Sequence, residues 1–353
     1  MPEKPGALGW RMPAEWERHE ATWIAWPHDR DDWPDRFGPI PWVYAEIVRH
    51  LHHGERVHIL VNNVRQREQA VQLLARLPLD QTRIQFFEIP TDRVWTRDYA
   101  PLFVVDGDGQ VGMTAWQFNA WAKYQNWRRD AAVPRRINET LHLPAWQPSI
   151  HRKRVVLEGG SIDVDGQGLL LTTEECLLGE VQARNPGLSR ADLEQLFADY
   201  LGVHKVLWLN RGIAGDDTHG HIDDVARFVA PSTLVVAVEE DPGDANYEPL
   251  RENMERLLGM TNLQGDKLRV VSLPMPAPVH FDGQRLPASY ANFYMANDRV
   301  LVPTFNDPQD RRALGILAEV FPDRTIVGIH ASDLVWGFGT LHCLTQQQPA
   351  GAG

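Results

Sequence analysis

Residues 189–202 read SRADLEQLFADYLG and form the best-marked helix of the chain. Ser189 can cap the first turn, acidic residues follow it, and Gly202 comes directly after the last apolar residue as a stop. The run Lys205–Leu209 that follows is short, apolar and typical of a buried strand. This stretch therefore predicts a helix followed by a strand, and the same arrangement recurs on both sides of it.

Apolar residues at helical spacing predict further helices at Val43–His53, Arg65–Leu77, Ala131–Leu143, Asn246–Leu258 and Gln309–Phe321. From Arg65 onward, the centres of the predicted helices lie about 60 residues apart, which is a period typical of repeated architectures. The spacing favours five strand–strand–helix–strand units. Because no sequence identity between the units is visible, a conventional mixed α/β domain is the alternative interpretation.

Short β-rich runs punctuated by Gly, Pro, Asn and Asp lie between these helices. They predict strands at Arg56–Val61, Arg83–Ile89, Leu102–Val105, Arg154–Leu157, Gly168–Thr172, Lys205–Leu209, Val225–Val229, Thr233–Val238, Leu268–Leu273, Arg299–Val302 and Thr325–Ile329. No Pro-, Gly- or Ser-rich linker interrupts the series. We therefore expect residues 1–353 to form a single domain.

The charge of the chain excludes some classes of partner. Lys and Arg number 35 and Asp and Glu number 47, which gives a net charge of −12. Binding to nucleic acid depends on basic patches, so we expect no nucleic-acid partner; a small cationic ligand fits better, although a solvated acidic surface would give the same charge. No run is apolar enough for a secretory signal or a membrane span, so we expect a cytoplasmic protein without membrane contact.

Polar clusters follow most of the predicted helices at similar distances. They are Trp95-Thr96-Arg97-Asp98, Glu158-Gly159-Gly160, the residues from Asp216 to Asp223, and His342-Cys343. If the units are equivalent, these clusters occupy equivalent places and converge on one axis. The unit after Leu258 supplies no comparable cluster.

Two chemistries fit the segment Gly215-Asp-Asp-Thr-His-Gly-His-Ile-Asp223. Alternation along a strand would place His219, His221 and Asp223 on one face, as a metal site requires. A metal hydrolase that acts on guanidino groups would need a second cluster of Asp and His ligands, and the sequence contains none, which disfavours the metal.

The other chemistry pairs His221 with a remote Cys343 as base and nucleophile, with Asp98, Asp223 and Glu158 as supporting carboxylates. The chain has two cysteines, too few for a disulfide framework or a four-thiolate zinc site. We expect the other one, in Thr-Glu-Glu-Cys176-Leu-Leu, to fill the core.

A series of motifs extends along nearly the whole chain. They are Met12-Pro13-Ala14-Glu15-Trp16, Trp-x-Arg-Asp, Leu-Glu-Gly-Gly-Ser, Thr-Thr-Glu-Glu-Cys-Leu-Leu, Gly-Asp-Asp-Thr-x-Gly-His-Ile-Asp and Leu-His-Cys-Leu-Thr-Gln-Gln. In this order they resemble the agmatine deiminases, within the guanidine-modifying superfamily that includes arginine deiminases and amidinotransferases. The resemblance implies the pentein fold, an α/β propeller of five ββαβ blades around a pseudo-fivefold axis. It implies no metal and no organic cofactor, and homo-oligomers are common in that family.

Residue by residue, the resemblance assigns Cys343 as the nucleophile, His221 as the general acid and base, and Glu158 as the carboxylate that orients the histidine. The implied reaction is hydrolysis of agmatine to N-carbamoylputrescine and ammonia through a covalent thiouronium on the cysteine. Alternatives are deimination of another guanidine such as peptidyl-arginine, a metal-dependent guanidino hydrolase, and a non-catalytic protein that binds cations.

The same resemblance assigns Asp98 and Asp223 as the catalytic pair that grips the guanidinium, and Trp95 and Asp217 as contacts of the substrate chain and distal amine. A guanidinium is a planar fork of donors, so carboxylates are its natural partners.

The sequence departs from the family pattern at two places. Trp336-Gly337-Phe338-Gly339-Thr340 stands where many members carry Gly-Gly-Gly-Asn, and His219 stands where Asn or Asp is common. The bulkier Phe338 and Thr340 could alter the pocket wall, so these departures bear on the choice of substrate.

Overall fold

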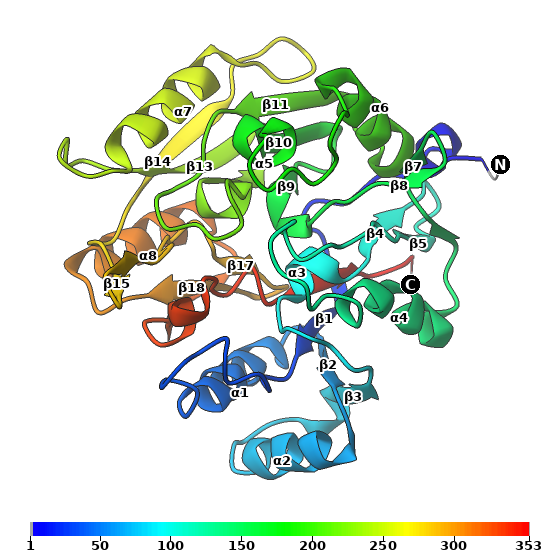
Figure 1. The fold of residues 1–353 in the computed structure, drawn as a ribbon, viewed down its shortest axis with the longest axis vertical. Coiled ribbons are helices and arrows are strands. Elements are labelled where there is room, and N and C mark those ends of the chain that lie inside the picture. Colours follow the sequence, from blue (N-terminus) through cyan, green and yellow to red (C-terminus); the bar gives the residue numbers. More distant parts are fainter. Residues whose placement is uncertain (1–2, 353) are drawn as a thin grey trace.

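The computed structural model describes residues 3–352. Within that range the longer strands form five separate sheets of three or four strands each. The longer helices lie on the outside of the molecule and follow one another around it in chain order, whereas the short helix α3 (Thr96–Tyr99) lies near the centre (Figure 1). The fold is therefore mixed α/β, as the sequence predicts.

Four of the sheets share one strand order: an antiparallel strand, a central strand, a helix and a parallel strand. The first of them contains β4 (Leu102–Val105), β5 (Val111–Thr114), α4 (Val133–Leu141) and β6 (Ala145–Trp146). The others are β9 (Ile162–Val164), β10 (Leu169–Thr173), α6 (Arg190–Leu201) and β11 (Lys205–Leu209); β12 (Ala226–Ala230), β13 (Thr233–Val238), α7 (Tyr247–Gly259) and β14 (Arg269–Pro274); and β17 (Tyr294–Met295), β18 (Arg299–Thr304), α8 (Pro308–Val320) and β19 (Thr325–His330).

The remaining sheet joins the two ends of the chain. Its order is β20 (Gln346–Pro349), β1 (His19–Ala25), β2 (Arg56–Val61) and β3 (Ile84–Glu88), and only β20 runs antiparallel to its neighbour. Helix α1 (Ile40–Leu51) connects β1 to β2, and α2 (Val64–Leu74) leads on to β3. The helix that matches those of the other sheets is therefore α1. Counting the repeat from the helix at Arg65–Leu77 is wrong, because the sequence prediction lacks β1 and β20.

All six predicted helices are present, and their ends differ from the predicted ones by at most three residues. Ser189 caps α6 by accepting from the N–H of Asp192, whose carboxylate accepts from the N–H of Ser189 in return. Gly202 ends that helix with a φ of 68°, a backbone conformation that glycine adopts without strain. These local signals explain why the helices could be predicted well.

The predicted strand Arg154–Leu157 is largely wrong. Only its first residue lies in a strand, β8 (Lys153–Arg154), which forms a hairpin with β7 (Ser149–Ile150). The next residues form only an isolated parallel bridge, in which the backbone of Gln117 bonds that of Val155 and Leu157. On the other edge, the side-chain amide of Asn185 binds both the N–H and the C=O of Val156, so a side chain takes the place of a neighbouring strand there.

Several short elements complete the described chain. They are α5 (Glu174–Leu178), β15 (His280–Phe281), β16 (Gln284–Arg285) and the 3-10 turns Pro5–Leu8, Gln81–Arg83, Asp130–Ala132, Gly159–Ser161, Ile222–Asp224 and Leu334–Gly337. Every helix between residues 3 and 352 is too short or too polar to span a lipid bilayer.

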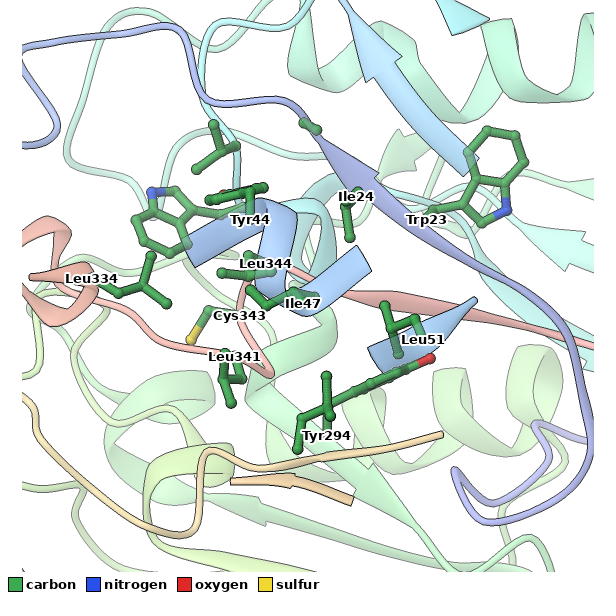
Figure 2. Packing of buried hydrophobic residues seen from close by; sticks show 14 of the residues in the cluster. Trp23, Ile24, Tyr44, Ile47, Leu51, Tyr294, Leu334, Leu341, Cys343 and Leu344 are labelled. Atoms are coloured by element: carbon green, nitrogen blue, oxygen red, sulfur yellow. The ribbon is translucent and has the colours of Figure 1, made fainter. Parts of the chain in front are cut away.

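The largest apolar cluster includes a cysteine, Cys343, at its edge. Figure 2 shows the side chain of Cys343 among fully buried residues of that cluster, including Tyr44, Leu341 and Leu344. Pairing of β20 with β1 fixes the chain just after this cysteine, and the hydroxyl of Thr96 donates to the carbonyl of Leu344 at 2.7 Å. The fold thereby holds Cys343 where the packed core meets a cavity.

Candidate active site

The cavity has a volume of about 350 Å³ and is lined by residues from distant parts of the chain. Cys343 and Asp98 line it together with glycines of the loop before the cysteine. Its other walls are aromatic and acidic and comprise Trp95, Trp121, Tyr124, Phe281, Trp336, Phe338, Asp29, Asp31, Asp32 and Asp217. Such a surface suits a cation with an apolar chain.

The sulfur of Cys343 lies beside an asparagine that sequence reasoning missed. The side-chain amide of Asn292 donates to Sγ at 3.2 Å and to Oδ1 of Asp224 at 3.0 Å. Its oxygen accepts from the hydroxyl of Thr340 at 2.7 Å and the N–H of His342 at 3.0 Å. The unit after Leu258, which was predicted to supply no polar cluster comparable to the others, therefore contributes a single residue to the site. A single Asn between aromatic residues gives no pattern that sequence reasoning could have used.

His221 is not on a strand, so the predicted shared face of His219, His221 and Asp223 is wrong. His219 has a φ of 63° and Gly220 a φ of 98°, and these left-handed residues turn the chain before a 3-10 turn that begins at Ile222. The ring of His219 is partly exposed and lies 3.9 Å from Glu175, whereas His221 is buried. The turn separates the two histidines.

Three carboxylates surround the ring of His221. Its Nδ1 lies 3.9 Å from both Asp98 and Asp223, and its Nε2 lies 3.8 Å from Glu158. Neither ring nitrogen has a hydrogen-bond partner within residues 3–352. Burial lowers the pKa of the imidazole, but Asp98, the Cys176 sulfur and Glu158 outweigh burial and raise that pKa well above its ordinary value. These neighbours therefore favour the protonated form of the ring.

Glu158 is held by an arginine that sequence reasoning also missed. Nε of Arg184 donates to the two carboxylate oxygens at 3.1 and 3.3 Å, and both side chains are buried. Burial raises the pKa of Glu158, but Arg184 and His221 together outweigh it, so the pKa lies below its ordinary value. Glu158 is therefore an ionised partner for the histidine.

Asp98 lies on α3 and, among the described residues, has no arginine partner of the kind that Glu158 has. Its Oδ2 accepts from the indole N–H of Trp121 at 2.9 Å, and its Oδ1 accepts from the backbone N–H of Gly160 at 3.1 Å. A Cβ on Gly160 would lie 2.6 Å from the ring of His221 and 2.9 Å from Asp98, so this close packing requires glycine. Burial, reinforced by Asp223 and Glu158, outweighs the opposing charge of His221 and raises the pKa of Asp98 to about 7.

Asp223 and Cys343 are both buried, but their pKa values are shifted in opposite directions. Burial raises the pKa of Asp223, but contacts with His342 and the charges of His221 and Arg227 outweigh burial and lower that pKa. The pKa of Cys343 is raised well above its ordinary value by burial and by the carboxylates nearby, first among them Asp223. Without a bound cation, the sulfur is a thiol.

Trp95 and Asp217, the predicted contacts of the substrate chain, both line the cavity. Trp95 packs against Trp33 with ring centroids 5.8 Å apart. The carboxylate of Asp217 is already engaged, because it pairs with the ammonium of Lys123 and accepts from the hydroxyl of Tyr124 at 2.7 Å. An amine that binds Asp217 must therefore compete with Lys123.

Of the residues that depart from the family pattern, Trp336 to Gly339 line the cavity, whereas Thr340 and His219 do not. Phe338 adopts a φ of 65°, and Trp336 stacks on Phe281 with centroids 3.8 Å apart. A Cβ on Gly339 would lie 2.7 Å from the ring of Trp95, so the loop approaches that ring closely. Thr340 points away from the cavity and holds Asn292.

One group of side chains has the composition of a metal site. Ligand atoms of Glu158, Cys176 and His221 lie within 4.8 Å of one another. Cys176 is a free thiol in the core as predicted, but it also lies beside the histidine, which the prediction did not include. Arg184 occupies both oxygens of Glu158, so a metal ion would have to displace that guanidinium.

Comparisons with known proteins agree over nearly the full length. A family model described as Porphyromonas-type peptidyl-arginine deiminase matches residues 11–349. Agmatine deiminases of Pseudomonas aeruginosa and Stutzerimonas stutzeri are each 37% identical over 369 aligned residues, which cover 98% of this chain and 97% of each relative. A solved structure of the agmatine deiminase of Enterococcus faecalis has a TM-score of 0.91 at 36% identity and covers 99% of this chain and 98% of its own.

Proposed function

Because the chain belongs to the Porphyromonas-type peptidyl-arginine deiminase family and its full-length relatives include agmatine deiminases, we propose that it hydrolyses agmatine to N-carbamoylputrescine and ammonia. We further propose that residues 1–353 form one catalytic domain, with the five sheets as blades around a pseudo-fivefold axis.

One observation carries the assignment to this site: Cys343 and Asp98 line one cavity, and the buried side chains of His221 and Asp223 lie directly beside them. Sγ of Cys343 lies 3.8 Å from Asp223, and Nδ1 of His221 lies 3.9 Å from both Asp98 and Asp223. Two carboxylates on either side of a planar guanidinium would hold its central carbon in place for the sulfur.

The charge of the substrate favours the thiolate form of the nucleophile. In the free site, buried carboxylates keep the pKa of Cys343 high. A guanidinium between Asp98 and Asp223 offsets those charges, so the sulfur can release its proton to solvent water, and His221 keeps its own proton for the leaving nitrogen. The thiolate then attacks the central carbon and forms a tetrahedral adduct.

His221 transfers the protons of both half-reactions. It protonates the departing nitrogen, ammonia leaves, and a thiouronium remains on Cys343. The neutral imidazole then removes a proton from water, which attacks the same carbon and displaces the sulfur. The product is a urea-type N-carbamoyl amine, and the free thiol is restored.

The carboxylates of the cavity wall favour an amine over a carboxylate at the far end of the substrate. Asp29, Asp31 and Asp217 line the cavity, and the one guanidinium among the lining residues, Arg93, is paired with Asp32 at 2.6 Å. The free amine of agmatine would be attracted by these carboxylates, whereas the α-carboxylate of arginine would be repelled.

The assay incubates the purified protein with agmatine, arginine or a peptidyl-arginine, with and without a chelator, and measures ammonia, urea and the carbamoyl product. We expect ammonia and N-carbamoylputrescine from agmatine regardless of chelator, and no turnover by Cys343→Ser. Release of urea that a chelator abolishes would refute the cysteine mechanism. Faster turnover of the peptide than of agmatine would instead identify a peptidyl-arginine deiminase.

A further inference from the structure

The side chain that precedes the nucleophile lies between two acids. Nδ1 of His342 lies 2.7 Å from Oδ2 of Asp223, and Nε2 lies 2.7 Å from Oε2 of Glu15. All three residues are at most 3% exposed. They come from three distant parts of the chain, since Glu15 precedes β1, Asp223 lies between β11 and β12, and His342 precedes β20.

The far acid, Glu15, is surrounded by cations. Its Oε2 lies 2.9 Å from Arg227 and 3.3 Å from Arg97, and its Oε1 accepts from the N–H of Met295 at 2.8 Å. Burial raises the pKa of Glu15, but Arg227, His342 and Arg97 outweigh burial and hold it well below its ordinary value. Glu15 is therefore a carboxylate.

The charge on the imidazole follows from these two contacts. A ring nitrogen 2.7 Å from the oxygen of an ionised carboxylate must donate a proton to it. Both nitrogens of His342 face such oxygens at 2.7 Å, so the geometry favours a ring with a proton on each nitrogen. The neighbouring acid Asp163 does not compete for the ring, because it pairs with Arg227 at 3.2 Å and accepts from the N–H of Phe228.

Because of the contact with His342, the two carboxylate oxygens of Asp223 have different surroundings. Oδ2 is bound by Nδ1 of His342, whereas Oδ1 is buried and has no hydrogen-bond partner among the described residues. The other charged or titratable groups that act on Asp223 are Asp98, Asp224, the sulfur of Cys343, His221 and Arg227. The first three are acidic and oppose its charge, whereas His221 and Arg227 favour it.

We propose that His342 is a positioning residue, an imidazolium clamped by Glu15 that holds Asp223 ionised with Oδ1 directed at the substrate guanidinium. The inference rests on the proposed function, because it assigns Asp223 to the guanidinium. The imidazolium supplies the local cation that offsets Asp98 and Asp224. Glu15, fixed by two arginines, keeps the ring from turning away.

The test replaces His342 by glutamine, which keeps a hydrogen-bond donor for Asp223 but removes the charge. Asp223 then takes up a proton at higher pH, so kcat/KM for agmatine should fall about 10- to 100-fold at pH 6.5, the loss expected for a charged hydrogen bond. The loss should be smaller at pH 8.5 and should lie mainly in KM. His58→Gln is the matched control, because His58 is 5% exposed and packs on Trp23 and Phe87 rather than on acids.

Equal losses at both pH values, as for a general packing defect, would overturn the proposal. Nitrogen-15 spectra of the imidazole rings of the unaltered protein give a second reading that does not depend on turnover or on the folding of a variant. Two protonated nitrogens on His342 at pH 7 are expected, and a neutral ring would overturn the proposal. Absence of ammonia release by the unaltered protein, with an imidazolium still observed, would contradict the proposed function rather than this charge state.

Discussion

Replacing Arg184 by methionine should destabilise the protein by about 3–5 kcal/mol, because it leaves a carboxylate buried without its cation. Nε of Arg184 binds both oxygens of Glu158, one terminal nitrogen donates to the carbonyl of Gln182 at 2.9 Å, and the other donates to the carbonyl of Thr218. Methionine fills a similar volume but makes none of these bonds.

The magnitude follows from burial. Hydrogen bonds to charged groups contribute about 1.5–3 kcal/mol each, but those on one side chain are not additive, so the cost of breaking a buried pair is the better guide. If the whole chain unfolds in one transition, a loss of this size lowers Tm by about 4–7 °C. The pKa of Glu158 should also rise, because Arg184 is the main influence that lowers it.

The assay is thermal unfolding of three variants beside the unaltered protein. Arg135→Met is the matched control, because Arg135 is 64% exposed and pairs with Glu139 on the surface of α4, where an ion pair contributes at most about 1 kcal/mol. Adding Glu158→Gln to the Arg184 variant removes the unpaired charge and should recover part of the loss. A change in Tm no larger than that of the control would refute the reasoning.

Three further outcomes are expected. Lys123→Ala should lower KM for agmatine by up to about fivefold, because it frees Asp217 from an exposed ion pair; steady-state kinetics would contradict this with an unchanged or higher KM. Asp98→Asn should abolish turnover yet stabilise the fold by about 2–4 kcal/mol at pH 8, because the ordinary carboxyl is ionised above pH 4 and this one only above about 7. In urea unfolding, that gain should vanish toward pH 4, and a loss of stability at pH 8 would disprove it. Alkylation of Cys343 by iodoacetamide should be slower at pH 7 than that of a free cysteine and rise at alkaline pH, since the pKa of the thiol is raised; peptide mass spectrometry measures the rate, and fast reaction at neutral pH would count against a buried thiol.

The helices could be predicted from the sequence because their start and stop signals are local. Ser189 and Gly202 cap α6 within the helix itself, and no distant residue is needed. Strand β1 lacked such a signal: Trp23 pairs with His58 on one side and Gln346 on the other, more than 300 residues away in the chain. Pairing over such a distance leaves no periodic mark in either segment.

The residues of the site likewise differ in whether the sequence predicts them. The segment that contains His221 could be recognised because it is dense in Asp, His and Gly, whereas Asp98 and Cys343 were assigned because their motifs resemble those of the family. Asn292 and Arg184 are single polar residues in ordinary surroundings, and only the folded chain brings them to the sulfur and to Glu158. What the sequence does not reveal is therefore the set of groups that fixes the charge of each site residue.

Those groups give the acids of the site different tendencies to ionise. Arg184 keeps Glu158 ionised, and His342 does so for Asp223. Asp98 accepts from the N–H groups of Trp121 and Gly160 and lies 3.9 Å from His221, but burial and the neighbouring carboxylates outweigh these contacts and raise its pKa to about 7. A substrate guanidinium would add a second cation beside this carboxyl. Binding of the substrate therefore favours ionisation of Asp98 and of the nearby thiol together, so that the charges needed for attack form only when a cation occupies the cavity.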